Sequence, residues 1–302
     1  VRGEDMTWNG LELAACRLPI QNPDTPVYGV IGNPVGHSRS PALHNGALAS
    51  CSMPGVYVPL LVDSLPDFLA AFPSNDYAGF SVTIPHKEAA LECCDEVDPV
   101  AQSIGAVNTI IRQPDGSLKG YNTDWEAAIG AIEAQLGSGE RPLEGKTVVV
   151  VGAGGAGRGV AFGARHKGAA RVLIANRNPE RAEALAASIE GAEAVSWEDL
   201  QEGHVAGDVL ANTTSVGMVP NVEDTPVPAA GLQKAKYALV FDAVYTPMET
   251  RLLKDAAASG SITVSGLEMF VGQAAAQFKL FTGEAGPVDL MRQKVLDSLQ
   301  AN

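Results

Sequence analysis

The segment that most constrains the fold is Thr147–Val151, TVVVV in the sequence, followed at once by the glycine-rich residues 152–157. This run is too continuous in apolar character for a strand with one solvated face, and it predicts a buried central strand of a parallel sheet. The next six residues, GAGGAG, fit the spacing G-x-G-x-x-G and lead into a helical pattern. In a strand, turn and helix of this kind, the glycines let the backbone approach a pyrophosphate at the helix N-terminus.

This context favours a dinucleotide site over an ordinary turn between a strand and a helix, which uses similar glycines. Folds that bind NAD carry Asp or Glu about 20 residues further on, but the corresponding segment here is Asn176, Arg177 and Asn178. A guanidinium at Arg177, with Arg181 one helical turn later, would pair with a 2′-phosphate, so the sequence predicts NADP(H). The alternative is that both arginines are solvated surface residues. The predicted cofactor loop comprises Gly152, Ala153, Gly154, Gly155, Ala156 and Gly157.

Strand-like runs alternate with helical patterns along the 302 residues, which favours an α/β fold with mostly parallel sheets and about two domains. Asn178 and Pro179 are expected to begin a helix that Gly191 ends. A turn at 114–116 is expected to join two strands as an antiparallel hairpin. The expected strands are 27–31, 55–61, 79–83, 108–112, 118–121, 147–151, 171–175, 208–212 and 238–242.

The composition excludes several classes of protein. A net charge of −14 opposes binding to nucleic acid or to anionic membranes. Four cysteines without a CxxC pair indicate neither a disulfide framework nor a metal site, and they favour a reducing cytoplasm. No apolar window is long enough to span a membrane. The N-terminus has no signal-peptide pattern and no initiator Met, so the chain is interpreted as an excised piece. The five histidines have no metal-ligand spacing, and no metal is expected.

Further segments make a family resemblance specific. With the glycine loop and Asn176-Arg177, they occur in one order from about residue 26 to the end, and together they resemble shikimate dehydrogenase. The segments 212–218 (NTTSVGM) and 241–247 (FDAVYTP) are most similar to the dehydrogenase half of plant-type bifunctional dehydroquinate dehydratase/shikimate dehydrogenase. The other matching segments are GNPVGHSRSP at 32–41, VTIPHKE at 82–88, GAVNT at 105–109, GYNTD at 120–124 and GLEM at 266–269.

The resemblance implies two α/β domains with an active-site cleft between them. The expected divisions are an N-terminal tail or linker at 1–25, a substrate-binding domain at 26–124 completed by 268–302, and a Rossmann NADP-binding domain at 125–267. The implied reaction is the reversible, NADPH-dependent reduction of 3-dehydroshikimate to shikimate, a step toward chorismate and aromatic amino acids. A monomer or homodimer is expected, in the cytoplasm or in a plastid, and a longer chain could carry a fused dehydroquinate dehydratase.

The resemblance assigns catalysis to Lys87 and Asp124. A positioned cation that can pass a proton stabilises the negative charge growing on the carbonyl oxygen, and an adjacent carboxylate keeps that cation charged and aimed. Without the family, Lys87 would be read as a surface lysine and Asp124 as a helix cap. The implied substrate-binding residues are Ser38 and Ser40 at the carboxylate, and Thr83, Lys87, Asn108, Asp124, Tyr245, Gln273 and Gln277. The further cofactor residues are Thr213, Val244, Gly266 and Met269.

Three rival functions stay open at this point. A quinate dehydrogenase using NAD shares the fold, but Arg177 and the retained Ser40 argue against it, since quinate carries an added hydroxyl near that serine. A different two-domain NADP enzyme, such as a methylenetetrahydrofolate dehydrogenase, would have no use for the paired serines. A shikimate-binding regulator without turnover would not need Lys87 and Asp124.

Overall fold

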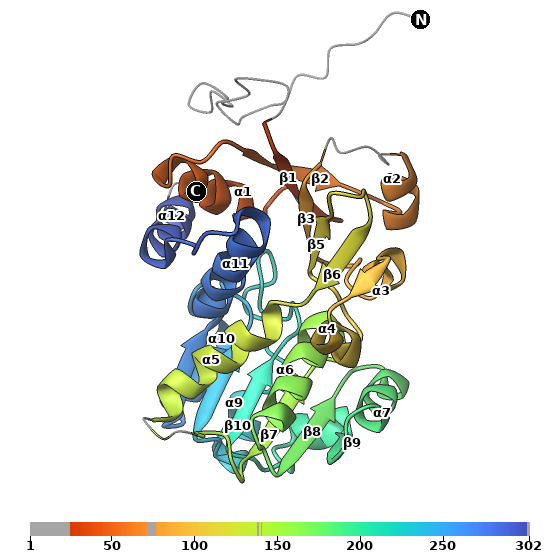
Figure 1. The fold of residues 1–302 in the computed structure, drawn as a ribbon. Coiled ribbons are helices and arrows are strands. Elements are labelled where there is room, and N and C mark those ends of the chain that lie inside the picture. The colour runs from red at the N-terminus through yellow and green to blue at the C-terminus, as the bar shows by residue number, and fades with distance from the viewer. Residues whose placement is uncertain (1–24, 72–76, 138, 140, 301–302) are drawn as a thin grey trace, which may run out of the picture.

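Two six-stranded sheets frame the molecule, one above the other in Figure 1. The computed structural model describes residues 25–71, 77–137, 139 and 141–300, so the expected linker lies, up to residue 24, outside the described residues. The first sheet has the strand order β2-β1-β3-β5-β6-β4. Its strands are β1 (Val27–Gly32), β2 (Val56–Leu61), β3 (Gly79–Val82), β4 (Glu96–Val97), β5 (Thr109–Arg112) and β6 (Leu118–Tyr121).

The first sheet is mixed. β1 pairs in parallel with β2 and with β3, whereas β5 runs antiparallel to both β3 and β6. The expected hairpin is thereby confirmed, with Thr109 opposite Tyr121 in the register. The sequence did not predict β4, because a strand of two residues has no periodicity to detect.

Helices cover both faces of the first sheet. One face packs on a core cluster that contains Leu43, Phe278 and Val295, so helices from the two ends of the chain share this core. The other face buries Phe80 and Ile110. The helices of this half are α1 (Ser40–Ser50), α2 (Leu65–Ala71), α3 (Ala89–Cys93), α4 (Pro99–Ile104), α11 (Gly266–Thr282) and α12 (Val288–Gln300).

The second sheet is parallel throughout, in the order β12-β11-β10-β7-β8-β9. The order reverses direction between β7 and β10, and ligands of such sheets bind where the carboxyl ends of the strands flank that reversal. Residues 148–151 of β7 are fully buried, which confirms the expected central strand. The strands are β7 (Thr147–Val151), β8 (Arg171–Ala175), β9 (Ala192–Val195), β10 (Val209–Asn212), β11 (Leu239–Asp242) and β12 (Ile262–Ser265).

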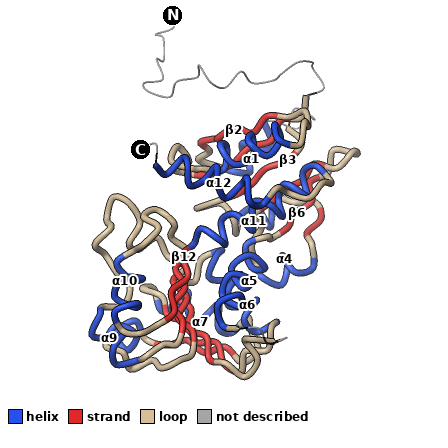
Figure 2. The backbone as a smooth tube through the Cα atoms, turned by 90° about the vertical axis from the view of Figure 1, so that its left-hand side faces the viewer, coloured by secondary structure: helices blue, strands red, loops and turns tan. Residues whose placement is uncertain are grey.

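Two layers of helices enclose the second sheet, which Figure 2 shows nearly edge-on. Side chains of α5, α6 and α7 pack with Val148 and Val150 on one face, and side chains of α8, α9 and α10 pack with Val149 and Val151 on the other. The helices are α5 (Asp124–Leu136), α6 (Gly155–His166), α7 (Pro179–Ala187), α8 (Trp197–Gln201), α9 (Ala229–Ala235) and α10 (Arg251–Ala258). Helix α11 packs along α5 and so joins the two halves.

The two ends of α7 differ in how well the sequence predicted them. The Asn178 side chain accepts hydrogen bonds from the backbone N–H groups of Glu180 and Arg181, as expected of an N-cap. The predicted stop at Gly191 is wrong, because α7 already ends at Ala187, and Gly191 instead turns the chain with φ 74° just before β9.

Within the described residues, no helix combines the length and the apolar character that a membrane span requires.

Candidate active site

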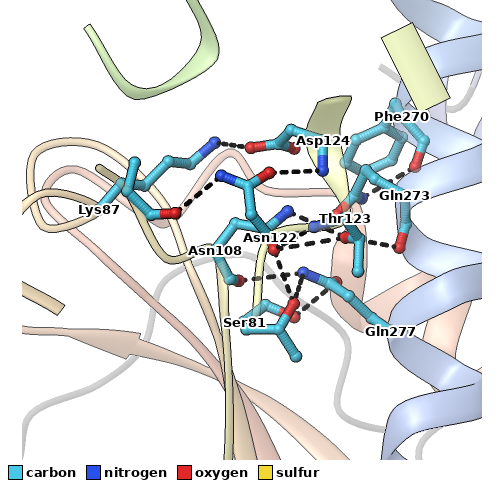
Figure 3. A network of polar contacts seen from close by, with 11 residues as sticks. Ser81, Lys87, Asn108, Asn122, Thr123, Asp124, Phe270, Gln273 and Gln277 are labelled. Carbon is cyan, nitrogen blue, oxygen red and sulfur yellow. Dashed lines mark hydrogen bonds and ion pairs between the residues drawn. The ribbon is translucent and has the colours of Figure 1, made fainter. Parts of the chain in front are cut away.

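Lys87 and Asp124 form a nearly buried ion pair. Lys87 lies in the loop after β3 and Asp124 begins α5, and the structure places Lys87 Nζ 2.6 Å from Asp124 Oδ2 (Figure 3). Their side chains are only 16% and 6% exposed. At this depth water screens the attraction weakly, and the carboxylate holds the ammonium in one direction.

The start of α5 is anchored without any help from the Asp124 carboxylate. Asn122 accepts a hydrogen bond from the Asp124 backbone N–H at 3.0 Å and donates to the carbonyl of Ala106 at 2.8 Å. The N-cap residue is Thr123, and its side chain makes no cap hydrogen bond. The interpretation of Asp124 as a helix cap is therefore wrong, and its carboxylate is left for Lys87.

A buried polar network lies beside this pair (Figure 3). Asn108 accepts from the backbone N–H of Thr123 at 2.9 Å and donates through Nδ2 to Thr123 Oγ1, also at 2.9 Å. Gln273, predicted to contact substrate, donates its side-chain amide to the carbonyl of Phe270 within its own helix. Gln277 donates through Nε2 to the Asn108 carbonyl and to Thr109 Oγ1. Both amide hydrogens of Gln277 are therefore bonded within the protein, and its side chain holds Asn108 and Thr109 in place.

The predicted carboxylate-binding serines lie at the start of α1. Ser40 is the first residue of the helix and is buried, and its backbone N–H donates to Ser38 Oγ at 3.3 Å. This bond is the local type that a Ser-Pro turn favours, and it leaves the Ser38 hydroxyl proton available to a ligand. Thr83 lies half-buried at the end of β3, where its methyl group packs close to Gly32.

Tyr245 connects the second sheet to the serine segment. It follows β11, and its ring stacks on Phe270 of α11 with the centroids 4.4 Å apart. Burial raises the pKa of Tyr245 to about 12, against the opposing charge and backbone hydrogen bond of Arg39. Tyr245 is therefore a neutral hydroxyl adjacent to the loop that holds Ser38 and Ser40.

The glycine loop has the shape and charge that an anionic cofactor needs. Gly152 adopts φ 107°, and a Cβ on Gly157 would lie 2.1 Å from the Gly152 carbonyl oxygen, so both positions require glycine. Gly154, the N-cap of α6, offers no capping side chain, and the first turn carries no acidic residue. The N–H groups at this helix end are left for a pyrophosphate. A Cβ on Gly155 would lie 2.9 Å from Lys87 Cδ, so the predicted catalytic lysine packs against the predicted cofactor loop.

The segment after β8 holds the predicted phosphate-binding arginines. Asn176 accepts from the Ala153 N–H at 3.3 Å and so ties this segment to the glycine loop. Arg177 is exposed, with no ion-pair partner in the described part of the chain. Arg181 donates to Glu88 Oε1 at 2.7 Å, and Glu88 lies 3.6 Å from Arg158 through its other oxygen. The exposed guanidinium of Arg177 fits a 2′-phosphate, whereas Arg181 already has a carboxylate partner.

The remaining predicted cofactor residues follow the carboxyl ends of β10, β11 and β12. Thr213 donates through Oγ1 to the Val151 carbonyl at 2.7 Å, which places it against the glycine loop. Gly266 donates its N–H to the Val244 carbonyl at 3.3 Å, and a Cβ on Gly266 would meet the Ala243 carbonyl oxygen at 2.2 Å. Met269 is buried one helical turn further along α11.

Several residues of the site lie outside the predicted set. Glu88 adjoins Lys87 in the sequence, and Arg158 adjoins Gly157, but neither position carries a signal that could reveal their contact. Tyr57, Ser81 and Asp242 lie within predicted strands, where a polar side chain is easily taken for a solvated one. His86 places Nε2 2.7 Å from the Val62 carbonyl. The described residues contain no group of three His, Cys, Asp or Glu arranged for a metal ion.

Comparisons with protein families cover most of the described chain. Residues 30–110 match the shikimate dehydrogenase substrate binding domain, residues 135–244 match shikimate / quinate 5-dehydrogenase, and residues 266–296 match the shikimate 5′-dehydrogenase C-terminal domain.

Individual proteins are similar over the same range. A chloroplastic bifunctional 3-dehydroquinate dehydratase/shikimate dehydrogenase of Arabidopsis thaliana is 58% identical over 90% of this chain, which spans 46% of that relative's length. A shikimate dehydrogenase (NADP(+)) of Bacillus cereus is 38% identical, with 90% of this chain and 98% of the relative covered. The solved structure of a shikimate 5-dehydrogenase from Thermus thermophilus, in complex with NADP(H) and shikimate, is 37% identical with a TM-score of 0.79. That comparison covers 90% of this chain and 99% of the other.

Proposed function

Because the chain belongs to the shikimate dehydrogenase family, we propose that it catalyses the reversible, NADPH-dependent reduction of 3-dehydroshikimate to shikimate. The observation that carries the proposal is the 2.6 Å pair of Lys87 and Asp124, in which the Lys87 stem packs against Gly155 of the glycine loop. Reduction of a carbonyl group needs a hydride donor at the carbon and a proton donor at the oxygen. The packing of Lys87 on the glycine loop supports the supply of both at one place.

NADPH, when bound, supplies the hydride. The residues proposed to hold it are the N–H groups of the glycine loop at the pyrophosphate and Arg177 at the 2′-phosphate. Val244 and Met269 are proposed to line the nicotinamide end, since both lie near the carboxyl ends of the central strands. These assignments follow the ordinary position of a dinucleotide in a sheet with this strand order.

Lys87 is proposed as the group that manages the proton. Its ammonium carries three hydrogens, of which one is directed to Asp124, so two remain for a carbonyl oxygen. As negative charge grows on that oxygen, the ammonium stabilises it and can pass it a proton. Asp124 then stabilises the pair in either direction of the reaction, because its carboxylate stays within hydrogen-bond reach of Nζ.

The substrate carboxylate is proposed to bind Ser38 and Ser40, with the Tyr245 hydroxyl near the same end. In the turn that Ser40 closes, Ser38 Oγ acts as an acceptor, so its proton can be donated to a ligand. Quinate carries an additional hydroxyl at the carbon that bears the carboxylate, and buried Ser40 occupies space near that carbon. A preference for shikimate follows, but discrimination against an added hydroxyl can be modest.

Initial rates with shikimate or quinate, each against NADP⁺ or NAD⁺, test this proposal. We expect the highest kcat/KM for shikimate with NADP⁺. Faster turnover of quinate with NAD⁺ would favour the rival quinate dehydrogenase. Shikimate binding without any turnover by the pure protein would favour a regulator, and no binding at all would overturn the proposal.

The proposed domains are 26–124 completed by 268–302, and 125–267. The core that α1 shares with α11 and α12 supports the return of the C-terminal segment to the first domain, and the packing of α5 on the second sheet supports a division near residue 124. A cytoplasmic or plastid location, a monomer or homodimer, and a fused dehydratase stay predictions. The plant relative's name bears on location and on fusion with a dehydratase.

A further inference from the structure

Two buried residues behind the site belong to none of the predicted binding motifs. Tyr57 on β2 is 1% exposed and Ser81 on β3 is 5% exposed. Tyr57 donates its hydroxyl to Ser81 Oγ at 2.6 Å, and Ser81 donates to Gln277 Oε1 at 2.7 Å. Figure 3 shows Ser81 and Gln277 below Asn108, on the side away from the pair of Lys87 and Asp124. A buried hydroxyl costs free energy unless it is paired, so this arrangement is a fixed part of the fold.

The chemistry of each partner determines the direction of every bond. The main-chain carbonyl of Asn108 can only accept, so the Gln277 atom 3.1 Å away must be Nε2. The Gln277 oxygen then faces Ser81, which must donate its single proton to it. Ser81 Oγ can consequently only accept from Tyr57. In each of these hydrogen bonds, only one assignment of donor and acceptor is possible. The amide of Gln277 cannot flip without breaking two bonds.

The same logic determines what Asn108 presents to a ligand. Thr109 Oγ1 accepts from Gln277 and therefore donates to Asn108 Oδ1, at 2.8 Å. The backbone N–H of Thr123, which can only donate, also points to Oδ1. Oδ1 is thereby occupied by two donors, and the unused hydrogen-bonding capacity of the side chain lies on Nδ2. One Nδ2 hydrogen goes to Thr123 Oγ1, and the other is available.

We propose that Tyr57 and Ser81 are positioning residues that fix the amide of Gln277, and through it Asn108, so that Asn108 presents a hydrogen-bond donor to a ring oxygen of the substrate. The inference rests on the proposed function, since it assigns the ligand of Asn108. The oxygen opposite Asn108 must then act as acceptor, as a hydroxyl or carbonyl oxygen of shikimate or 3-dehydroshikimate can.

His44 completes the surroundings of Tyr57 without adding charge. Its ring stacks on that of Tyr57 with the centroids 4.3 Å apart and the planes 9° apart. Burial lowers the pKa of His44 to about 3, against a hydrogen bond with Gln277 that raises it. His44 is therefore neutral at ordinary pH and holds the tyrosine ring in place over the first sheet.

The test compares Ser81→Ala and Tyr57→Phe with the control Tyr28→Phe. Tyr28 is a buried tyrosine of the same core whose hydroxyl donates to the Phe281 carbonyl and not to this network. Ser81→Ala removes the donor that holds Gln277 Oε1, while the two bonds of Nε2 remain. We expect KM and Kd for shikimate to rise roughly 5- to 30-fold, because a buried acceptor is left unpaired. Tyr57→Phe removes the donor to Ser81 together with a hydrogen bond to Ser40, and we expect a rise of about 2- to 5-fold. Tyr28→Phe should change shikimate KM less than about 2-fold.

NADP⁺ binding, followed by equilibrium titration, is expected to be unchanged in all three variants, because the network lies on the substrate side. A merely structural defect would lower both affinities or lower the melting temperature in step with KM. The proposal is overturned if Ser81→Ala matches Tyr28→Phe in shikimate KM, or if NADP⁺ affinity falls equally. Failure of the wild-type protein to bind or turn over shikimate would instead count against the proposed function.

Discussion

At the residue scale, Lys87 contacts both predicted halves of the site. Its ammonium pairs with Asp124, and its aliphatic stem lies against Gly155 at the start of α6. A long side chain that buries its stem and directs its charge toward one carboxylate is a common use of lysine. In the proposed function, the same residue positions the substrate oxygen and limits how closely the glycine loop approaches it.

Lys87→Ala should remain folded and bind NADPH, and kcat should fall about 100-fold or more because the proton donor is lost. Initial rates and a fluorescence titration of NADPH measure the two effects separately. Lys119→Ala is a matched control, since Lys119 lies in the same half and pairs with exposed Glu96. Near-normal turnover by Lys87→Ala would remove Lys87 from the catalytic role.

Arg177→Ala should raise KM for NADP⁺ roughly 10- to 100-fold and leave KM for NAD⁺ nearly unchanged, because a charge-assisted contact with a 2′-phosphate is lost. Steady-state kinetics with both cofactors measure the ratio. Arg171→Ala is the control, since Arg171 is an exposed arginine at the start of β8, paired with Glu193. Equal effects on the two cofactors would contradict the 2′-phosphate assignment.

At the scale of elements, β11 ends in a buried carboxylate that organises the loop carrying Val244 and Tyr245. Asp242 accepts from Asn212 at 2.9 Å, from the Val244 N–H at 3.0 Å and from Thr250 at 2.6 Å. Burial raises the pKa of Asp242 to about 6, against these three hydrogen bonds. The loop is therefore held by the Asp242 carboxylate, whose ionisation in this buried position costs free energy.

Asp242 makes stability depend on pH. The folded protein holds this proton up to about pH 6, whereas the unfolded chain releases it near pH 4, so the contribution of Asp242 to stability is present below pH 4 and lost as pH rises to 6. Asp242→Asn keeps the shape and cannot ionise. The free energy of unfolding of the variant, relative to wild type, should rise between about pH 4 and 7 by up to about 3 kcal/mol. Denaturant titrations across this range measure it, and a constant difference would contradict the raised pKa.

The sequence predicted those strands and helices whose pattern lies in neighbouring residues. The buried strand Thr147–Val151, the hairpin of β5 and β6, and the Asn178 cap were found from apolar runs, turn residues and capping chemistry. The strands β4, β9 and β12 were not predicted. They are short edge strands with exposed side chains, so pairing with a neighbour and not their own pattern makes them strands.

At the scale of the whole molecule, Glu88 forms ion pairs between the two halves. It follows Lys87 in the first half, and its carboxylate lies 2.7 Å from Arg181 of α7 and 3.6 Å from Arg158 of α6. With a net charge of −14, the protein cannot attract an anionic cofactor by its overall field. Binding of the cofactor then depends on local cations. Glu88 partly neutralises two of these, Arg181 and Arg158.

Glu88→Gln should therefore strengthen NADP⁺ binding, by up to about fivefold, because partly exposed ion pairs are worth at most about 1 kcal/mol. NAD⁺ binding should stay unchanged, since NAD⁺ has no 2′-phosphate to meet Arg181. Equilibrium titrations of both cofactors measure the effect, and Glu92→Gln, an exposed acid on α3, is the control. Weaker NADP⁺ binding by Glu88→Gln would show that Glu88 orients Arg181 and does not compete for it.

The sequence by itself determined the alternation of strands and helices and the glycine loop, which rest on neighbouring residues whose spacing is visible in one dimension. The proposed catalytic pair, Lys87 and Asp124, came from the resemblance to a family and not from spacing. Only the tertiary structure decided that Asp124 does not cap its helix, that Gln277 serves Asn108 from behind, and that Glu88 pairs with Arg181. Such contacts join residues far apart in the chain, and the direction of a hydrogen bond or the partner of a charge is set by packing, which no local pattern records.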